Sequence, residues 1–322
     1  MRHAAARLLA AAWLASGASL DAQQLPDRDF APRIAAPAFA PTSGPRLCVD
    51  EAHDNFHTLD NRFYAFGQLA ARDGYRVAAL RVRFDAASLG ACDILVISNA
   101  QNGIPWNQQP RPTPSAFTSA EIAEVRAWVE RGGALLLIAD HQPLAGAARD
   151  LAAAFGAEFI DGFAYAGIEA ASIEANRGGG SAAPTLFRPA DSTLVGTHPI
   201  AQGRRASEHI TQVRSFTGQA FRWPSAGVQA LLRLPADYVS LEPRYAWQFD
   251  STTASRPVGG WLQGATRHVG RGRAALFGEA AMFSAQLAGA ERRPMGMNAP
   301  QAEQNAQFVL NTLHWLSGLL ER

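Results

Sequence analysis

Ile94-Leu95-Val96-Ile97-Ser98 is the stretch that decides the fold of this chain, because no polar side chain interrupts it before the terminal serine. An unbroken apolar run is typical of a strand buried on both faces of a parallel sheet. A second such run spans Ala134–Ala139, and a helical pattern over Ser119–Glu130 lies between the two and stops at Gly132-Gly133. Strand, helix and strand in this order predict a parallel pair joined by a crossover helix.

The same alternation extends to both sides of these runs and predicts a doubly wound α/β sheet with an antiparallel C-terminal extension. The expected strands are Leu47–Asp50, Tyr75–Val82, Ile94–Ser98, Ala134–Ala139, Glu158–Ile160, Thr211–Phe216, Val228–Leu234, Gly260–Val269 and Arg273–Phe277, the last two forming a hairpin. The expected helices are Asn61–Asp73, Ser119–Glu130, Leu144–Phe155 and Ala302–Leu316.

Composition changes along the chain predict three segments. Residues 1–22 have a weakly basic start, a short apolar core and small residues, which is the pattern of an export signal. Residues 23–45 are rich in Pro and Ala and read as a linker or arm, and residues 46–322 form one α/β domain with a long excursion near 164–206. The apolar core at the start is shorter than the ~20 residues of a membrane span. We therefore expect a periplasmic or secreted protein without a membrane span.

Polar side chains gather where the predicted parallel strands end. Asp50-Glu51-Ala52-His53-Asp54-Asn55-Phe56-His57 follows the first strand, Asp140-His141 follows Ala139, and Gly278-Glu279 follows Phe277. Carboxyl ends of parallel strands meet at one edge of a sheet, where ligands bind. The candidate catalytic residues are therefore Asp50, Glu51, His53, His57, Asp140, His141 and Glu279.

Two kinds of chemistry fit this cluster. His53, His57, Asp140 and His141 match the ligands of a divalent metal such as zinc. The same residues fit a metal-free site in which a carboxylate orients an imidazole. A structural interpretation stands beside both, since residues 54–60 could cap the following helix and Asp140-His141 could form a turn.

Several functions are excluded or disfavoured. All 29 basic side chains are arginine, which excludes every site that needs a lysine amine, and a net charge of +1 gives no basic surface for nucleic acid. A Gly-x-Ser-x-Gly elbow is absent from the sequence. Cys48 and Cys92 could pair or remain as buried thiols, and neither lies at a strand end that would suit a nucleophile.

Two further segments have a structural or a binding interpretation. His198-Pro199-Ile200 resembles a turn that enters a strand. The loop that contains Trp106 could form a wall of the site, with an aromatic ring that stacks on a sugar.

Several short motifs together resemble the class I glutamine amidotransferase-like superfamily, which has a flavodoxin-like fold. They are Asp93–Asn99, Trp128–Ile138, His198-Pro199-Ile200 and the terminal run from Gly270-Arg271-Gly272-Arg273 through Phe277-Gly278-Glu279 to Trp315-Leu316. More narrowly, the chain is similar to an uncharacterised bacterial branch related to the auxiliary domains of some gliding-type transporters. Active members of the superfamily carry a nucleophilic cysteine at the turn after the third strand, where this chain reads Ser98-Asn99-Ala100. The resemblance therefore does not imply glutamine hydrolysis.

Two functions remain open from the sequence. The first is an exported hydrolase that uses the cluster, with or without a metal, on a small molecule or glycan. The second is a non-catalytic periplasmic module that binds a ligand or assembles with a partner. The sequence contains no indication of the oligomeric state.

Overall fold

The computed structural model describes residues 24–168, 170–171 and 185–320. The predicted export signal lies outside these residues, as does part of the predicted excursion. Within the described ranges, no helix combines the length and the apolar character that crossing a bilayer requires.

A nine-stranded sheet forms the centre of the molecule. Its strands run in the order β3-β2-β4-β5-β15-β14-β10-β6, and β11 also pairs with β14. The strands from β3 to β15 are parallel, whereas β14, β10, β6 and β11 pair antiparallel. The bounds are β2 Arg46–Asp50, β3 Arg76–Leu80, β4 Ile94–Ser98, β5 Ala134–Ile138, β6 Glu158–Phe159, β10 Phe221–Arg222, β11 Gln229–Arg233, β14 Leu262–Val269 and β15 Gly272–Phe277. The prediction of an α/β fold is thereby confirmed. The central sheet is mostly parallel and carries additional antiparallel strands.

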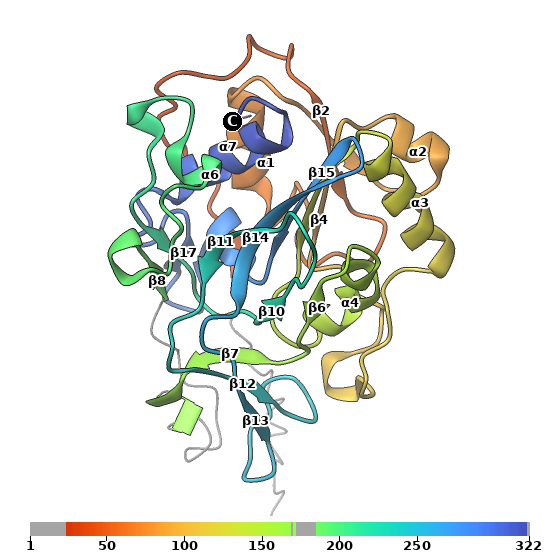
Figure 1. Cartoon of the computed structure of the whole chain (residues 1–322), viewed down its shortest axis with the longest axis vertical. Coiled ribbons are helices and arrows are strands. Elements are labelled where there is room, and N and C mark those ends of the chain that lie inside the picture. The colour runs from red at the N-terminus through yellow and green to blue at the C-terminus, as the bar shows by residue number, and fades with distance from the viewer. Residues whose placement is uncertain (1–23, 169, 172–184, 321–322) are drawn as a thin grey trace, which may run out of the picture.

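Helices cover both faces of this sheet (Figure 1). Side chains alternate between faces along each buried strand, so neighbouring residues of one strand enter different cores. In β4, Ile94 and Val96 pack with α1 and α7, whereas Leu95 and Ile97 pack with α2, α3 and α4. The bounds are α1 Tyr64–Arg72, α2 Ala86–Gly90, α3 Ser119–Glu130, α4 Leu144–Ala154, α6 Pro199–Gln202 and α7 Asn305–Leu316. The continuous apolar runs in the sequence are explained by burial on both faces.

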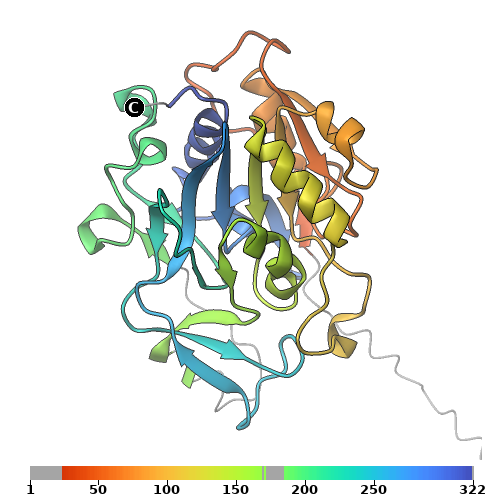
Figure 2. The same cartoon turned by 45° about the vertical axis from the view of Figure 1, so that its right-hand side comes forward.

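Three small sheets complete the described fold. They are β1 Gln24–Pro26 with β16 Ala285–Ala288 and β17 Arg293–Gly296; β7 Phe163–Ala166 with β12 Tyr238–Glu242 and β13 Ala254–Pro257; and β8 Leu186–Phe187 with β9 Val213–Arg214. Figure 2 shows β13-β12-β7 at the end of the molecule toward which the parallel strands point. This small sheet thus borders the edge at which the candidate residues were expected.

Some boundaries and elements differ from the prediction. The predicted linker is packed from Gln24 onward, since β1 pairs with β16 and the amide of Ala38 donates to Asp73. Helix α2 was not predicted, because it has only five residues and too little periodicity to detect. The prediction that His198 begins a turn into a strand is wrong, because its side chain instead accepts from the Ile200 amide and caps α6.

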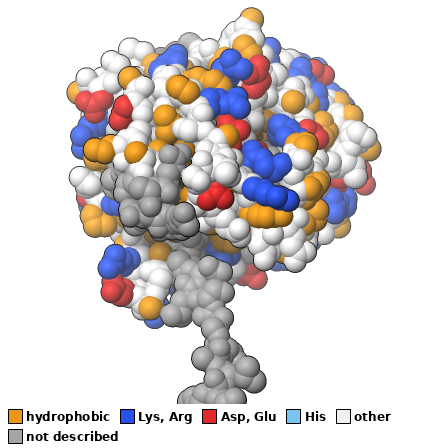
Figure 3. All heavy atoms as spheres, turned by 90° about the horizontal axis from the view of Figure 1, so that it is seen from below, with side chains coloured by type: hydrophobic (Ala, Val, Ile, Leu, Met, Phe, Trp, Pro, Cys, Tyr) orange, Lys and Arg blue, Asp and Glu red, His pale blue; other side chains and the backbone are white. Residues whose placement is uncertain are grey.

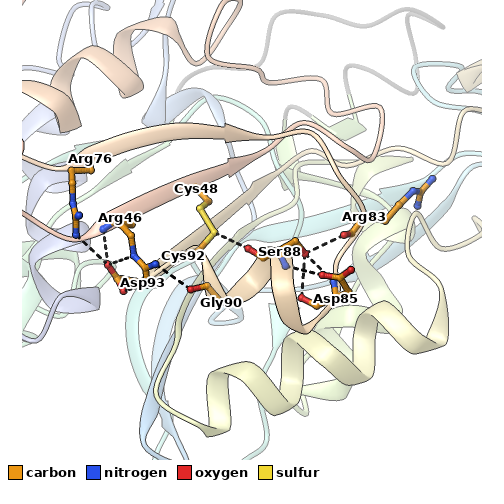
Figure 4. The surroundings of a disulfide bond; sticks show 9 residues. All are labelled: Arg46, Cys48, Arg76, Arg83, Asp85, Ser88, Gly90, Cys92 and Asp93. Carbon is orange, nitrogen blue, oxygen red and sulfur yellow. Dashed lines mark hydrogen bonds and ion pairs between the residues drawn. A yellow bond between two sulfur atoms is a disulfide. The ribbon is translucent and has the colours of Figure 1, made fainter.

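Cys48 and Cys92 form a disulfide (Figure 4). Cys48 lies in the middle of β2, and Cys92 lies just before β4, the neighbouring strand. Arg46 and Asp93 form an ion pair at 2.7 Å beside the bridge. The sequence left pairing and free thiols open, and the register of these two strands brings the sulfur atoms together.

Candidate functional site

His53 lies between two carboxylates at the carboxyl end of β2. Its Nδ1 is 2.9 Å from Asp50, and its Nε2 is 3.0 Å from Glu121 on the first turn of α3. All three side chains are buried. Because ionised carboxylates only accept hydrogen bonds, both ring nitrogens donate and the ring is an imidazolium. The arrangement binds β2 to α3 through charge-assisted hydrogen bonds.

Local structure explains why Glu121 reaches this position. Thr118 caps α3, and Oε2 of Glu121 accepts a hydrogen bond from the Thr118 amide, which leaves Oε1 for His53. Burial opposes ionisation of this carboxyl, but hydrogen bonds from Thr118 and His53 outweigh burial and lower its pKa to about 2. Phe84 and Phe117 cover the imidazolium, with ring centroids 4.5 and 4.6 Å away. His53 is therefore held by protein groups at both nitrogens and over its ring.

His57 is also engaged within the fold. Its Nδ1 is 3.0 Å from the hydroxyl of Ser98 at the end of β4, and its ring stacks on Phe63 at 4.6 Å. Burial, with a smaller effect of the nearby Arg62 charge, lowers its pKa to about 3. The imidazole is accordingly neutral at physiological pH, with its charged form disfavoured by the apolar surroundings.

Glu51 points to different partners. Its carboxylate accepts from the Leu59 amide at 2.8 Å and pairs with Arg81 at 3.0 Å. These contacts join the loop after β2 to the residue that follows β3, so both of them are structural.

The turn after β4 connects the two halves of the predicted cluster. Asn99 adopts a left-handed backbone with φ of 49°, and its side-chain oxygen accepts from the Asp140 amide at 2.9 Å. Its backbone oxygen accepts from the amide of Phe56. The side chain of Asn55 donates to Asp50 and to the Ser98 carbonyl. The polar groups after β2, β4 and β5 therefore lie together at one edge of the sheet.

Asp140 and Glu279 are two carboxyl groups at this edge, and the charge of Asp140 acts on Glu279. They follow β5 and β15, which are adjacent and parallel, so the alignment of those strands brings them together. Glu279 is fully buried and accepts from the amides of Ala281 and Met282, while Asp140 is partly exposed. Burial and the charge of Asp140 raise the pKa of Glu279 well above its usual range, and burial raises that of Asp140. Two like charges in one site favour retention of a proton by the pair.

His141 presents a free ring nitrogen beside this pair. Its Nδ1 is 2.7 Å from the carbonyl oxygen of Gln142, which can only accept, so Nδ1 donates this hydrogen bond, and Nε2 has no hydrogen-bond partner among the described residues. One face of the ring stacks on Phe163 of β7 at 4.5 Å. Trp106 and Trp247 contact the same imidazole edge-on, with centroids 6.0 and 4.6 Å away. The small β13-β12-β7 sheet thus supplies part of the wall around His141.

The predicted metal shell is not assembled. Among residues 24–168, 170–171 and 185–320, no group of three or more His, Cys, Asp or Glu side chains is arranged to hold a metal ion. The physical reason is that both nitrogens of His53 bind carboxylates, while His57 contacts Ser98 and lies in an apolar pocket against Phe63. His53 and His57 thus have different hydrogen-bond partners from Asp140 and His141, although all four residues follow strands that end at the same sheet edge.

Sequence reasoning missed two residues of this region. The Thr118-x-x-Glu121 pattern indicates a helix cap, but nothing in it shows that the second carboxylate oxygen reaches His53. Trp247 lies in the loop between β12 and β13, and no pattern in the sequence links that loop to His141. Figure 3 views this end of the molecule and shows basic, acidic and hydrophobic side chains interspersed.

Comparison with solved structures supports the fold. The mmIFT52 N-terminal domain superposes with a TM-score of 0.53 at 13% identity, over 84% of this chain and 97% of that domain. This likeness shows the fold alone. A ThuA-like protein from Bacteroides uniformis gives a TM-score of 0.47 at 12% identity over 89% and 94% of the two chains, and a cytoplasmic protein from Salmonella typhimurium gives 0.46 at 11% over 84% and 98%. No family model matches the sequence, and no curated protein matches it.

Proposed function

We propose that this chain is an exported hydrolase that works by acid–base chemistry at the carboxyl edge of the sheet, on a small molecule or glycan. The observation that carries the proposal is that Asp140, His141 and Glu279 follow the adjacent parallel strands β5 and β15 at one edge of the sheet, where burial raises the pKa of both carboxyl groups. Paired titratable groups whose environments set different protonation states are the usual acid and base of a hydrolytic site.

Each group has a role that its surroundings favour. His141 accepts a proton from water through Nε2, and the resulting hydroxide adds to the electrophilic carbon of the substrate. The carboxyl pair gives its proton to the leaving oxygen through Asp140, the partly exposed member. Transfer of the proton from the imidazolium back to the pair completes the cycle. Glu279 is fully buried and acts as a positioning residue that holds the proton on the pair.

Nucleophilic thiol chemistry has no part in the proposal. The two cysteines of the chain are joined in the Cys48–Cys92 disulfide, and Asn99 occupies the turn where active glutamine amidotransferases carry their cysteine. The strand order β3-β2-β4-β5-β15 corresponds to 2-1-3-4-5 among the parallel strands, the order of flavodoxin-like sheets, and supports the proposed relation to that superfamily.

Export to the periplasm or the medium is part of the same proposal. A disulfide between two strands of the central sheet favours an oxidising compartment. The pattern of residues 1–22, basic start followed by apolar core and small residues, supports the same location.

The test is a screen of purified protein against 4-nitrophenyl esters and 4-nitrophenyl glycosides, with three variants. We expect turnover by the wild type and a loss of about 100-fold or more in Asp140→Asn and His141→Gln, the usual range for general acid–base groups. Glu158→Gln is the matched control, because this exposed carboxylate lies on β6 and is paired with Arg222. Turnover that Asp140→Asn retains would exclude the proposed site.

A non-catalytic ligand-binding or assembly module is the second candidate. It is favoured by the interactions of His53 and His57, which engage two of the predicted catalytic imidazoles within the fold. Absence of turnover across the screen, together with saturable ligand binding at the same edge, would favour this module over the hydrolase.

A further inference from the structure

Trp247 combines exposure with backbone strain. Its side chain is 39% exposed, yet its backbone has φ of 66°, a left-handed conformation that is rare for a bulky residue. Strained conformations of this kind persist only where the surrounding structure holds them, and they cluster at ligand sites. An indole that served only to fill the surface would not need such a conformation. The strain therefore indicates that the position of the ring matters.

A rigid aromatic base holds the Trp247 ring in place. Phe163 lies 4.7 Å from it, and Phe249 in turn contacts both Phe163 at 5.2 Å and Tyr165 at 6.3 Å. Phe163, Tyr165 and Phe249 are buried, so the base is a packed cluster beneath an exposed ring. Trp247 is consequently fixed while part of its surface remains open.

Trp106 flanks His141 together with Trp247. Its Nε1 donates to the side chain of Gln101 at 2.6 Å, which fixes the orientation of the indole, and its ring contacts Phe56 at 5.8 Å. The two indoles are both roughly perpendicular to the imidazole, at 82° and 75°. The His141 imidazole therefore lies in aromatic surroundings, and the backbone amide of the same residue donates to the carboxylate of Asp140.

We infer that Trp247 and Trp106 form a platform that stacks against the pyranose ring of a carbohydrate at this site. A sugar ring has an apolar face for an indole and hydroxyl groups that both donate and accept hydrogen bonds, and Asp140 and His141 supply complementary groups. A cationic ligand fits less well, because a cation is already present beside the platform. The Arg62 guanidinium lies 3.7 Å from the ring centroid of Phe56, which contacts Trp106. The inference rests on the proposed function for the identity of the site and names its substrate class.

Isothermal titration with maltotriose, cellotriose, xylotriose and chitotriose tests the platform, with tetramethylammonium as a non-sugar probe. We expect at least one oligosaccharide to bind and Trp247→Gly to weaken it 10-fold or more. Glycine tolerates the left-handed backbone, so this variant removes the ring while relieving strain. Trp247→Tyr, which keeps a ring, should retain most of the affinity and guards against misreading a misfolded variant.

Trp261→Ala is the matched control, because that indole is also partly exposed but contacts the Arg222 guanidinium instead of His141. Failure of every sugar to bind, equal loss in the Trp247→Gly and Trp261→Ala variants, or binding of tetramethylammonium alone would overturn the inference. Measurement of turnover by the wild type separates the platform from the proposed function. Sugar binding that depends on Trp247, without turnover by the wild type, would retain the platform and refute the hydrolase.

Discussion

Glu121→Gln should destabilise the protein by removing the charge that holds His53. The carboxyl has a pKa of about 2 in the folded protein against an ordinary value of 4.5. Each pKa unit corresponds to about 1.4 kcal/mol, so ionisation of Glu121 contributes roughly 3 kcal/mol at pH 7. Glutamine keeps the shape of the side chain and removes this contribution. The expected loss agrees with the ~3–5 kcal/mol for breaking one side of a buried ion pair.

The loss should depend on pH in a defined direction. Because the folded pKa lies below the unfolded one, the contribution is complete above the unfolded pKa of 4.5 and disappears as the pH falls toward 2. The difference between wild type and Glu121→Gln should therefore shrink from roughly 3 kcal/mol at pH 7 to about 2 kcal/mol at pH 3.5.

Urea unfolding at both pH values measures this difference. Glu124→Gln is the matched control, since it removes a carboxylate from the same helix whose ion pair with Arg131 is long, at 3.8 Å, and whose effect should stay below ~1 kcal/mol. Equal midpoints for the Glu121→Gln and Glu124→Gln variants at pH 7 would refute the assignment. So would a difference from wild type that grows as the pH falls.

Three further outcomes are expected. Reduction of Cys48–Cys92, which spans a sequence separation of 44, should lower the free energy of unfolding by up to ~4 kcal/mol, and an unchanged urea midpoint in dithiothreitol would contradict this. Because the folded pKa of Glu279 is raised, wild type should lose stability as the pH rises above 4.5, while Glu279→Gln should not, as thermal melts at pH 5 and pH 8 would show. Gly218→Ala should cost ~1–3 kcal/mol, since a Cβ there would lie 2.3 Å from a backbone oxygen, whereas Gly90→Ala, with no neighbour within 4 Å, should be neutral or stabilising by urea unfolding.

The central elements could be predicted because their signals are local. The apolar runs of β4 and β5 need burial on both faces wherever they lie, and the helical pattern between them permits only a crossover connection. Glu279 could be placed at the correct edge once β15 was assumed to be parallel, and its pairing with β5 confirms that assumption.

The partners of the site residues could not be predicted, because each depends on contacts distant in sequence. His53 and His57 follow the same strand and appear equivalent in the sequence, yet one is charged between two carboxylates and the other is neutral against Phe63. Trp247 reaches His141 only because β12 pairs with β7.

The sequence by itself determined the alternation of elements and the edge on which polar groups collect, since side-chain periodicity and strand direction follow from local chemistry. The tertiary structure alone decided which imidazole is held by carboxylates, which is buried neutral and which keeps a free nitrogen. Protonation and access depend on charge, burial and hydrogen-bond partners in space, and more than sixty residues of sequence separate His53 from Glu121.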